Sequence, residues 1–449
     1  MEKKWEEMSP EEKQEALFQT WLSPKDHQGN DLKFQSPQAE KAYKERVTRF
    51  KDAIQLKKKP DRVPVFTIHG FFPALYAGFT PQEVMYDYDK LNIAFKKYVL
   101  DFAPDGHIGS VAPGPGKLFE ILDYKLYKWP GHGVSPEYGY QCNEGEYMMA
   151  DEYDALIQDP SNFYSNVYLP RIFGALQAFT APSLSNVLEM YGAGFNFIPY
   201  GIPPVQAAYK ALMEAGSEAL KWVGAIGAHG AEMATLGFPA FWDGPAKAPF
   251  DMIGDTLRGT KGIMTDMYRQ PDKLLQAMEV MTPLVIKMGV SGVKMSGVPI
   301  VPIVMHKGAD GFLSDEQYKK FYWPTFRKLL MGFIAEGIVP FCFAEGGYNS
   351  RLEIIRDLPK GKVIWWLDRT DMAKAKKILG DVACIGGNVP PDLLAVGTPQ
   401  QVKDQVKKLI DTCAKGGGYI MGNGTVIEQA KPENLHAMID FTKEYGVYK

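Results

Sequence analysis

The sequence predicts an α/β protein with a closed (β/α)8 TIM barrel, and three observations support this. Short apolar runs recur about 20 to 40 residues apart, and each is followed by a helix-forming stretch, which is typical of βα units. The runs are almost wholly apolar, as expected for parallel strands buried on both faces. The alternation becomes regular after residue 250, and a chain of 449 residues is long enough to close a barrel.

Residues 1–60 differ from the rest of the chain and are expected to form an N-terminal helical extension. They are highly charged, and Ser9-Pro10-Glu11-Glu12 has the pattern of a helix start with proline at the first helical position. The barrel is expected over 61–449. The pattern loosens at about 125–250, where apolar helical stretches around 170–194 and 203–235 predict a helical insertion.

The expected strands and helix starts follow from apolar runs and capping patterns. The strands are expected at 62–70, 104–111, 297–306, 338–343, 362–369, 382–388 and 418–424. Helices are expected to begin at Thr80, Ser314 and Thr398, where each residue opens a capping box. No Gly-x-Gly-x-x-Gly fingerprint follows the first strand and no P-loop occurs, which argues against nucleotide binding of those kinds.

The composition is that of an ordinary globular protein and excludes several function classes. The chain is 45% hydrophobic and 23% charged, and its net charge of -3 gives no reason to expect nucleic acid or an anionic membrane as partner. Four cysteines without paired spacing predict reduced thiols in a cytoplasm. The first residues lack the apolar core of a signal peptide, and no apolar run approaches the roughly 20 residues that span a bilayer. We therefore expect a soluble, cytoplasmic protein.

Polar residues stand at the carboxyl ends of the expected strands. They are His69, His306, Glu345, Asp368, Arg369, Asn388 and Asn423. In a barrel these positions converge on one mouth, where active sites lie. A carboxylate with two histidines suits general acid–base catalysis, which makes Glu345, His306 and His69 the candidate catalytic residues.

A zinc site is the alternative use of the same strand ends. His306, Glu345 and Cys342 have side chains that bind zinc, although no dense ligand pattern links them. The remaining candidates are expected to bind substrate. They are Phe343, Tyr348, Asn349, Trp365, Trp366, Asp368, Arg369, Asn388 and Asn423.

Several stretches resemble the uroporphyrinogen decarboxylase superfamily, which includes cobalamin-linked methyltransferases. The resemblance covers roughly residues 60 to 445. The stretches that carry it include Arg62-Val63-Pro64-Val65, Gly78-Phe79-Thr80-Pro81-Gln82-Glu83, Gly397-Thr398-Pro399-Gln400-Gln401-Val402 and Gly417-Gly418-Tyr419-Ile420-Met421-Gly422-Asn423-Gly424. The resemblance implies a (β/α)8 barrel, in agreement with the pattern of apolar runs.

The chain departs from two branches of that superfamily. Coenzyme M methyltransferases carry a His-x-Cys-Gly zinc motif where this chain has Phe343-Ala344-Glu345-Gly346, and no cysteine lies near Gly424-Thr425. The Arg-rich motif of true uroporphyrinogen decarboxylases would fall at Thr67–Phe72 and is missing. The group that remains demethylates small methylated compounds, and these enzymes pass the methyl group to a corrinoid (cobalamin), usually on a separate corrinoid protein.

The resemblance and the strand ends together predict a methyltransferase acting on a small, possibly methoxy-aromatic, substrate. Glu345, His306 and His69 would protonate the leaving atom or bind zinc. One alternative is a decarboxylase of a small or tetrapyrrole acid, with Arg369 or Arg258 holding the carboxylate. The other alternative is a non-catalytic barrel that binds a corrinoid or tetrapyrrole. A homodimer is compatible with the sequence.

Overall fold

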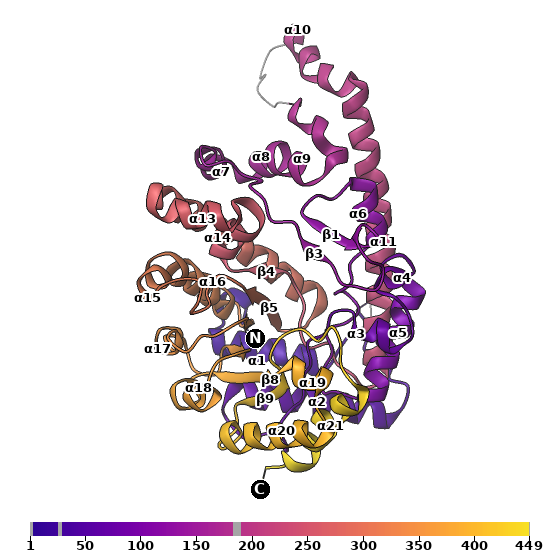
Figure 1. Cartoon of the computed structure of the whole chain (residues 1–449), viewed down its shortest axis with the longest axis vertical. Helices are drawn as coiled ribbons and strands as arrows, with labels where there is room; N and C mark the ends of the chain where they lie inside the picture. Colours follow the sequence, from indigo (N-terminus) through magenta and orange to yellow (C-terminus); the bar gives the residue numbers. More distant parts are fainter. Residues whose placement is uncertain (1–2, 26–28, 183–189, 449) are drawn as a thin grey trace.

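A sheet of six parallel strands forms the centre of the computed structural model, which describes residues 3–25, 29–182 and 190–448. Its order is β4-β5-β6-β7-β8-β9. Figure 1 labels β4, β5, β8 and β9 of this sheet. The strands are β4 (Ala246–Lys247), β5 (Ile300–Met305), β6 (Val339–Ala344), β7 (Ile364–Leu367), β8 (Cys384–Val389) and β9 (Tyr419–Asn423). Consecutive strands pair in parallel and are joined by helices, as the sequence predicts.

Two further extended segments close this sheet into a ring. Isolated parallel bridges join Val65 to Met421 of β9, Phe66 to Gly106, and His107 to Ala240. The backbone amide of Asp243 then donates to the carbonyl of Ile300 in β5 at 2.9 Å, which returns the ring to its starting sheet. The six strands and the segments around Val65 and Gly106 therefore form the eight-membered barrel that the sequence predicts.

The strands point alternate side chains into and out of this barrel. Phe66, Phe341 and Trp366 come from different strands, and their ring centroids lie 5.4 to 5.9 Å apart, so these three fill the interior. Their neighbours Val65, Cys342 and Trp365 belong instead to the larger apolar cluster that also contains the surrounding helices. This alternation decides which strand-end residues can reach the mouth.

Helices α1 (Pro10–Leu22) and α2 (Pro37–Gln55) cover the amino-terminal end of the barrel. Both begin at a serine N-cap followed by proline, as expected for Ser9. Phe50 of α2 packs on Phe241 with ring centroids 4.6 Å apart, and Phe241 packs on Phe66 at 4.0 Å. The barrel is therefore plugged by apolar side chains at this end, and a ligand must enter from the other.

The outer helices surround the barrel (Figure 1). They include α5 (Tyr88–Phe102), α14 (Pro271–Ser296), α16 (Trp323–Ala335), α18 (Met372–Leu379), α20 (Pro399–Cys413) and α21 (Pro432–Tyr445). Capping boxes at Thr80, Ser314 and Thr398 are formed as expected. By length and composition α14 could cross a membrane, but it packs on α16 and buries Leu274 and Val285 in the barrel's outer core.

Between the second and third strands of the ring, the chain forms a β-hairpin and a protruding helical arm. The hairpin strands β1 (Tyr127–Pro130) and β3 (Gln141–Cys142) pair antiparallel, and the sequence did not predict them. The arm is α11 (Pro203–Thr235), which matches the expected helix at 203–235 (Figure 1). The helix expected at 170–194 lies partly outside the described residues. Its described part is broken into α9 (Leu169–Ile172), η3 (Gly174–Thr180) and α10 (Met190–Ala193).

Candidate active site

His306 and Glu345 meet at the open end of the barrel. They directly follow the paired residues Met305 of β5 and Ala344 of β6, so the two strands deliver them side by side. Alternate residues of a strand face the same side, and Phe343, two residues before Glu345, belongs to the apolar cluster inside the barrel. Glu345 and its neighbour His306 are therefore on the side of their strands that faces the barrel interior. The His306 Nε2 atom is 3.5 Å from the Glu345 carboxylate. The structure therefore brings these two candidate residues into contact.

Asp255 completes the site and was not among the residues that the sequence predicts. It lies on the π-helical turn η5 (Met252–Leu257), which continues the short helix α12 (Pro249–Asp251) after β4. Its carboxylate is 2.6 Å from His306 Nδ1 and accepts a hydrogen bond from Lys307 Nζ at 2.6 Å. Lys247 Nζ lies 2.7 Å from the same carboxylate. His306 is thus held between two carboxylates, one on each ring nitrogen.

Asp251, four residues before Asp255, holds the loop that carries His306. Its carboxylate accepts hydrogen bonds from the backbone amides of His306 at 3.1 Å and Lys307 at 2.8 Å. The hydroxyl of Tyr322 donates a third hydrogen bond at 2.7 Å. These contacts fix the backbone at the end of β5, and the hydrogen bond from Nδ1 to Asp255 fixes the direction of the imidazole. An Asp-x-x-x-Asp spacing on a helical turn after a strand is the signal that could have found both aspartates.

The charges around His306 determine its protonation. Burial opposes the imidazolium, but the hydrogen bond to Asp255 and the charge of Glu345 outweigh it and raise the pKa of His306. Burial also opposes ionisation of Asp255, yet His306 and the two lysines hold its pKa well below the ordinary value. Burial raises the pKa of Glu345, and the nearby Asp368 adds to that effect. The site therefore pairs an imidazole whose cationic form is stabilised with a carboxyl group whose ionisation is disfavoured.

The side chains of this array differ in their exposure to solvent. The side chains of His306 and Glu345 are 38% and 32% exposed, whereas Asp255 and Lys307 are 13% and 8% exposed. His306 and Glu345 therefore face the open mouth, and the groups that tune them lie behind. A substrate at the mouth would meet His306 Nε2 and the Glu345 carboxyl group.

The β1–β3 hairpin places aromatic groups near the same mouth. Burial raises the pKa of Tyr127 and of the Cys142 thiol, and the charge of Asp255 contributes in both cases. Tyr140 stacks its ring edge on Tyr127 and on Phe71, with centroids 5.7 Å apart in each pair. Two aromatic side chains near the site, Tyr127 and Tyr140, thus come from the insertion and were not among the sequence candidates.

A pocket of about 540 Å³ lies at the ends of β7 and β8, against α20. Four predicted substrate residues line it: Asn349, Asp368, Arg369 and Asn388. Asp368 accepts a hydrogen bond from the amide of Gly346, next to Glu345, at 3.0 Å. Asn388 adopts a left-handed conformation, with φ of 84°, and its amide donates to the carbonyl of Asp368 at 2.7 Å. These residues shape the loops beside the His306–Glu345 pair.

Five other residues that the sequence predicts at the mouth of the barrel lie elsewhere in the structure. His69, Cys342, Tyr348, Trp365 and Asn423 are all buried and point away from the mouth or into the strand pairing. His69 packs on Tyr98 outside the barrel, with ring centroids 4.4 Å apart, because its side chain is on the outward-facing side of the first strand. Trp366 and Phe343 fill the barrel interior beneath the site. Local apolar patterns locate a strand end, but they do not say which face of the strand a residue occupies.

The zinc set expected from the sequence is not brought together. Cys342 is fully buried on the outward face of β6, opposite to Phe343 and Glu345. Across the described ranges, no group of three His, Cys, Asp or Glu side chains is arranged to hold a metal ion. The residues present therefore do not fit a zinc site made of His306, Glu345 and Cys342.

The fold and the site define a barrel enzyme with an acid–base array at its mouth, and comparisons with known proteins name its family. Residues 183–445, more than half of the chain, match the family model "Uroporphyrinogen decarboxylase (URO-D)". The chain belongs to this uroporphyrinogen decarboxylase family, as the sequence motifs indicated.

Individual relatives are distant. The chain is 26% identical over 185 residues to the uroporphyrinogen decarboxylase of Chlorobaculum parvum, covering 40% of this chain and 51% of the relative. It is 34% identical over 142 residues to that of Chlorobium phaeobacteroides, covering 30% and 39%. The matches thus span about half or less of these relatives. A methyltransferase from Methanosarcina mazei shares the fold, with a TM-score of 0.54, 14% identity, and coverage of 89% of this chain and 98% of that one.

Proposed function

We propose that this protein transfers a methyl group from a small methylated compound to a corrinoid. The observation that carries the proposal is the His306 imidazole, whose cationic form is stabilised by Asp255 and Glu345 at the open mouth of the barrel. Demethylation of an ether or amine leaves an oxygen or nitrogen that must be protonated, and a positioned imidazolium can supply that proton.

The proposed step uses the site as follows. A reduced corrinoid, bound at the open end of the barrel as the methyl acceptor, would supply the electron pair for the new bond to the methyl carbon. The bond from that carbon to the substrate oxygen or nitrogen breaks, and its electron pair stays on the leaving atom. His306 Nε2 gives its proton to that atom, while Asp255 stabilises the imidazolium before transfer. Glu345, whose pKa burial raises, can return a proton to His306.

The surroundings of the site suit a methoxy-aromatic substrate. Tyr140 is partly exposed beside Tyr127 and Phe71, so aromatic faces are available close to the hairpin. The methyl acceptor would be a cobalamin on a separate corrinoid protein in the cytoplasm, as in the family's methyltransferases. The open end of the barrel offers the space for such an encounter, because the other end is plugged by α1 and α2.

Decarboxylation remains the second candidate, because the curated relatives are named decarboxylases and two lysines lie at the site. The arginines expected to hold a carboxylate do not support it. Arg258 is buried and donates to Asp266 at 2.6 Å, and Arg369 has a side chain that is 84% exposed. Lys247 and Lys307 both contact Asp255 and would have to leave it to hold a substrate carboxylate.

Methyl transfer can be measured directly with reduced cobalamin and a panel of methoxylated arenes and methylamines. We expect methylcobalamin to appear in the visible spectrum with the wild-type protein. His306→Ala should lower the rate about 100-fold or more, since general acid catalysis contributes roughly 10² to 10⁴. The control is His436→Ala on α21, an exposed histidine far along the chain from the site, which should leave the rate unchanged.

Two results would contradict the proposal. Release of carbon dioxide from a carboxylated substrate, with no methylcobalamin from any methylated compound, would identify a decarboxylase. Tight cobalamin binding without turnover, unchanged by Glu345→Gln, would identify a binding barrel.

A further inference from the structure

The carboxylate of Glu428 lies on the inner side of the barrel mouth. Along the first strand, Ile68 belongs to the apolar cluster inside the barrel, whereas His69 packs on Tyr98 outside it. Gly70 is therefore the next residue on the inward side. A Cβ atom added at Gly70 would collide with the Glu428 carboxylate, so this carboxylate occupies the space in front of Gly70. Glu428 is exposed, and a ligand at the mouth can reach it.

The order of the ring places Glu428 across the mouth from His306 and Glu345. Counted from the first strand, β5 and β6 are the fourth and fifth members of the ring, and β9 is the eighth. Glu428 follows Ile427, which pairs with His69 of the first strand, so it stands between the eighth member and the first. In a ring of eight, this place is diametrically opposite the ends of β5 and β6, where His306 and Glu345 lie.

The width of the mouth suits a small aromatic molecule. Adjacent strands lie about 4.8 Å apart, and with a tilt of roughly 36° a ring of eight strands is about 15 Å across from backbone to backbone. Side chains that reach inward from opposite sides can therefore contact the two ends of one substituted benzene ring. His306 and Glu345 would meet one end of such a molecule, and Glu428 would meet the other.

No positive side chain neutralises Glu428. In the part of the chain that the structure describes, no lysine, arginine or histidine forms an ion pair with it, whereas Asp255 has both Lys247 and Lys307. The amide of Phe71 donates to Glu428 Oε2 at 2.9 Å, yet partial burial outweighs this hydrogen bond and raises the pKa of the carboxyl group. A carboxylate that is partly desolvated without a counter-charge is stabilised when a cation binds beside it.

Aromatic rings flank this carboxylate. A Cβ atom added at Gly139 of the hairpin loop would lie 3.4 Å from the ring of Phe71 and 3.8 Å from Glu428 Oε2. The next residue, Tyr140, packs on Phe71 and is 46% exposed. Burial raises the pKa of Tyr140, and the charge of Glu428 adds to that effect. Aromatic rings beside a carboxylate favour a cationic group, which the ring faces and the negative charge both attract.

We propose that Glu428 is a specificity-determining residue, which binds a protonated amino group of the substrate at the end opposite to the methyl group that is transferred. The substrate is then a methyl ether, such as a methoxy-arene, that carries an ammonium group, and a carboxylated methoxy-arene is repelled. This inference deepens the proposed function and rests on it, because methyl transfer is what assigns the methyl end of the substrate to His306.

Binding of three matched ligands, measured without corrinoid, tests the proposal. They are 4-methoxybenzylamine, 4-methoxybenzyl alcohol and 4-methoxybenzoate, which carry an ammonium, a hydroxyl or a carboxylate group on the same methoxyphenyl ring at neutral pH. Isothermal titration calorimetry of the wild-type protein should give roughly 10- to 100-fold tighter binding for the amine than for the alcohol, as expected for a hydrogen bond between charged groups. The benzoate should bind most weakly.

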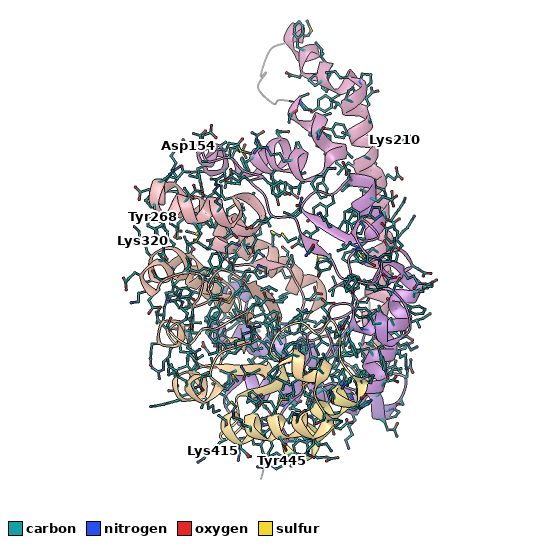
Figure 2. All side chains as sticks on the ribbon, viewed as in Figure 1. Asp154, Lys210, Tyr268, Lys320, Lys415 and Tyr445 are labelled. Carbon is teal, nitrogen blue, oxygen red and sulfur yellow. The ribbon has the colours of Figure 1, made fainter. Side chains whose placement is uncertain are left out.

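Glu428→Gln removes the charge and keeps the shape of the side chain, including an oxygen that accepts from the amide of Phe71. It should weaken binding of the amine about 10-fold or more and leave the affinity for the alcohol unchanged. Glu444→Gln is the matched control, because Glu444 is exposed in the last turn of α21. Figure 2 shows the neighbouring Tyr445 at the outer surface, far from the hairpin. This control should keep the wild-type preference for the amine.

Gly70→Ala separates the position of the charge from its presence. The added methyl group must displace the carboxyl group of Glu428, because the two would occupy the same space. This variant keeps every charge of the protein, and it should nevertheless bind the amine more weakly than the wild type does. An unchanged circular dichroism spectrum and an unchanged affinity for the alcohol would show that the fold is intact.

Equal affinities of the wild-type protein for the amine and the alcohol would overturn the proposal, as would a preference for the amine that survives Glu428→Gln. Failure of all three ligands to bind at millimolar concentration would also overturn it. The proposed function fails in a different way. If the preference for the amine depends on Glu428 but neither this ligand nor any other methylated compound gives methylcobalamin, the amine-binding role of Glu428 holds and methyl transfer is refuted.

Discussion

At the scale of single residues, His306 illustrates how neighbours decide what a side chain can do. Its imidazole is partly exposed, yet Asp255 on one nitrogen and Glu345 on the other raise its pKa. The Asp255 contact, at 2.6 Å, is the closer of the two and also fixes the ring orientation. His306 is therefore suited to give up a proton on the Nε2 side, toward the mouth.

Asp255→Asn should lower the pKa of His306, because the amide cannot stabilise the imidazolium as a carboxylate does. A general acid is active below its pKa, so the rate is lost as pH rises through that value. The falling limb of the pH–rate profile should move to lower pH in the variant, with roughly a 10- to 100-fold lower rate at neutral pH. An NMR titration of His306 checks the same shift without activity. Asp272→Asn, at an exposed helix start, is the control, and an unmoved His306 titration in Asp255→Asn would contradict this role.

Three other histidines are buried where the arm and α5 meet the barrel. His69, His107 and His229 are each no more than 2% exposed, and burial lowers their pKa values to about 3, 3 and 4. Above pH 6.5 these groups are neutral in both the folded and unfolded chains and have no effect on stability. As pH falls below 6.5 the unfolded chain takes up protons that the folded chain excludes, so stability is lost.

The free energy of unfolding should therefore fall between pH 6.5 and about pH 4, by up to about 1.4 kcal/mol per pH unit for each histidine. Replacing one of them with an apolar residue, as in His229→Leu, should reduce that slope. Urea unfolding at pH 7 and pH 5 measures it. An equal slope in His229→Leu would show that His229 is not held neutral.

At the scale of elements, close backbone contacts determine how the helices seat on the strands. A Cβ atom at Gly292 of α14 would lie 2.5 Å from the Cα of Gly244, just before β4. Gly244 has a φ of +84° and also lies against α14. This contact between two glycines lets α14 approach β4 and, through β4, sets the position of Lys247 and of the turn that carries Asp255.

Gly292→Ala should lower the free energy of unfolding by roughly 1 to 3 kcal/mol, because the added methyl group forces backbone apart. Gly230→Ala on α11 is the matched change, since a Cβ atom there meets nothing within 4 Å. It should raise the free energy of unfolding by about 0.5 to 1 kcal/mol, the usual gain of alanine over glycine inside a helix. Denaturant unfolding of both variants gives the comparison, and a stabilised Gly292→Ala protein would refute the close contact.

At the scale of the whole molecule, the closure of the ring depends on few interactions. The side chain of Asn423, at the end of β9, accepts from the amide of Ile68 at 3.1 Å and donates to the carbonyl of the same residue at 2.7 Å. Because an isolated bridge from Val65 to Met421 is what otherwise pairs the first strand with β9 in the described residues, this buried amide replaces part of a regular ladder. Asn423 is therefore a closure residue, although its position suggested a substrate contact.

Asn423→Ala should lower the free energy of unfolding by about 1 to 3 kcal/mol, since it leaves the buried amide of Ile68 without a partner, whereas the carbonyl of Ile68 still accepts from the amide of Ile427. Asn166→Ala removes a hydrogen bond to Asn162 at an exposed site and should change stability by under about 0.5 kcal/mol. Thermal or denaturant unfolding distinguishes the two. A loss for Asn423→Ala no larger than that of the control would mean that the ring closes without this amide.

The sequence by itself determined the βα alternation, the helix starts at Thr80, Ser314 and Thr398, and the barrel class. It also placed His306 and Glu345 at strand ends. These features arise from short-range physics: capping, chain stiffness and the burial of apolar runs. Only the tertiary structure decided which strand-end residues face the mouth, so that His306 and Glu345 meet while His69, Cys342 and Trp365 point outward. That choice, and the arrival of Asp255 from the turn after β4, depends on ring closure between segments far apart in the chain, which no local pattern encodes.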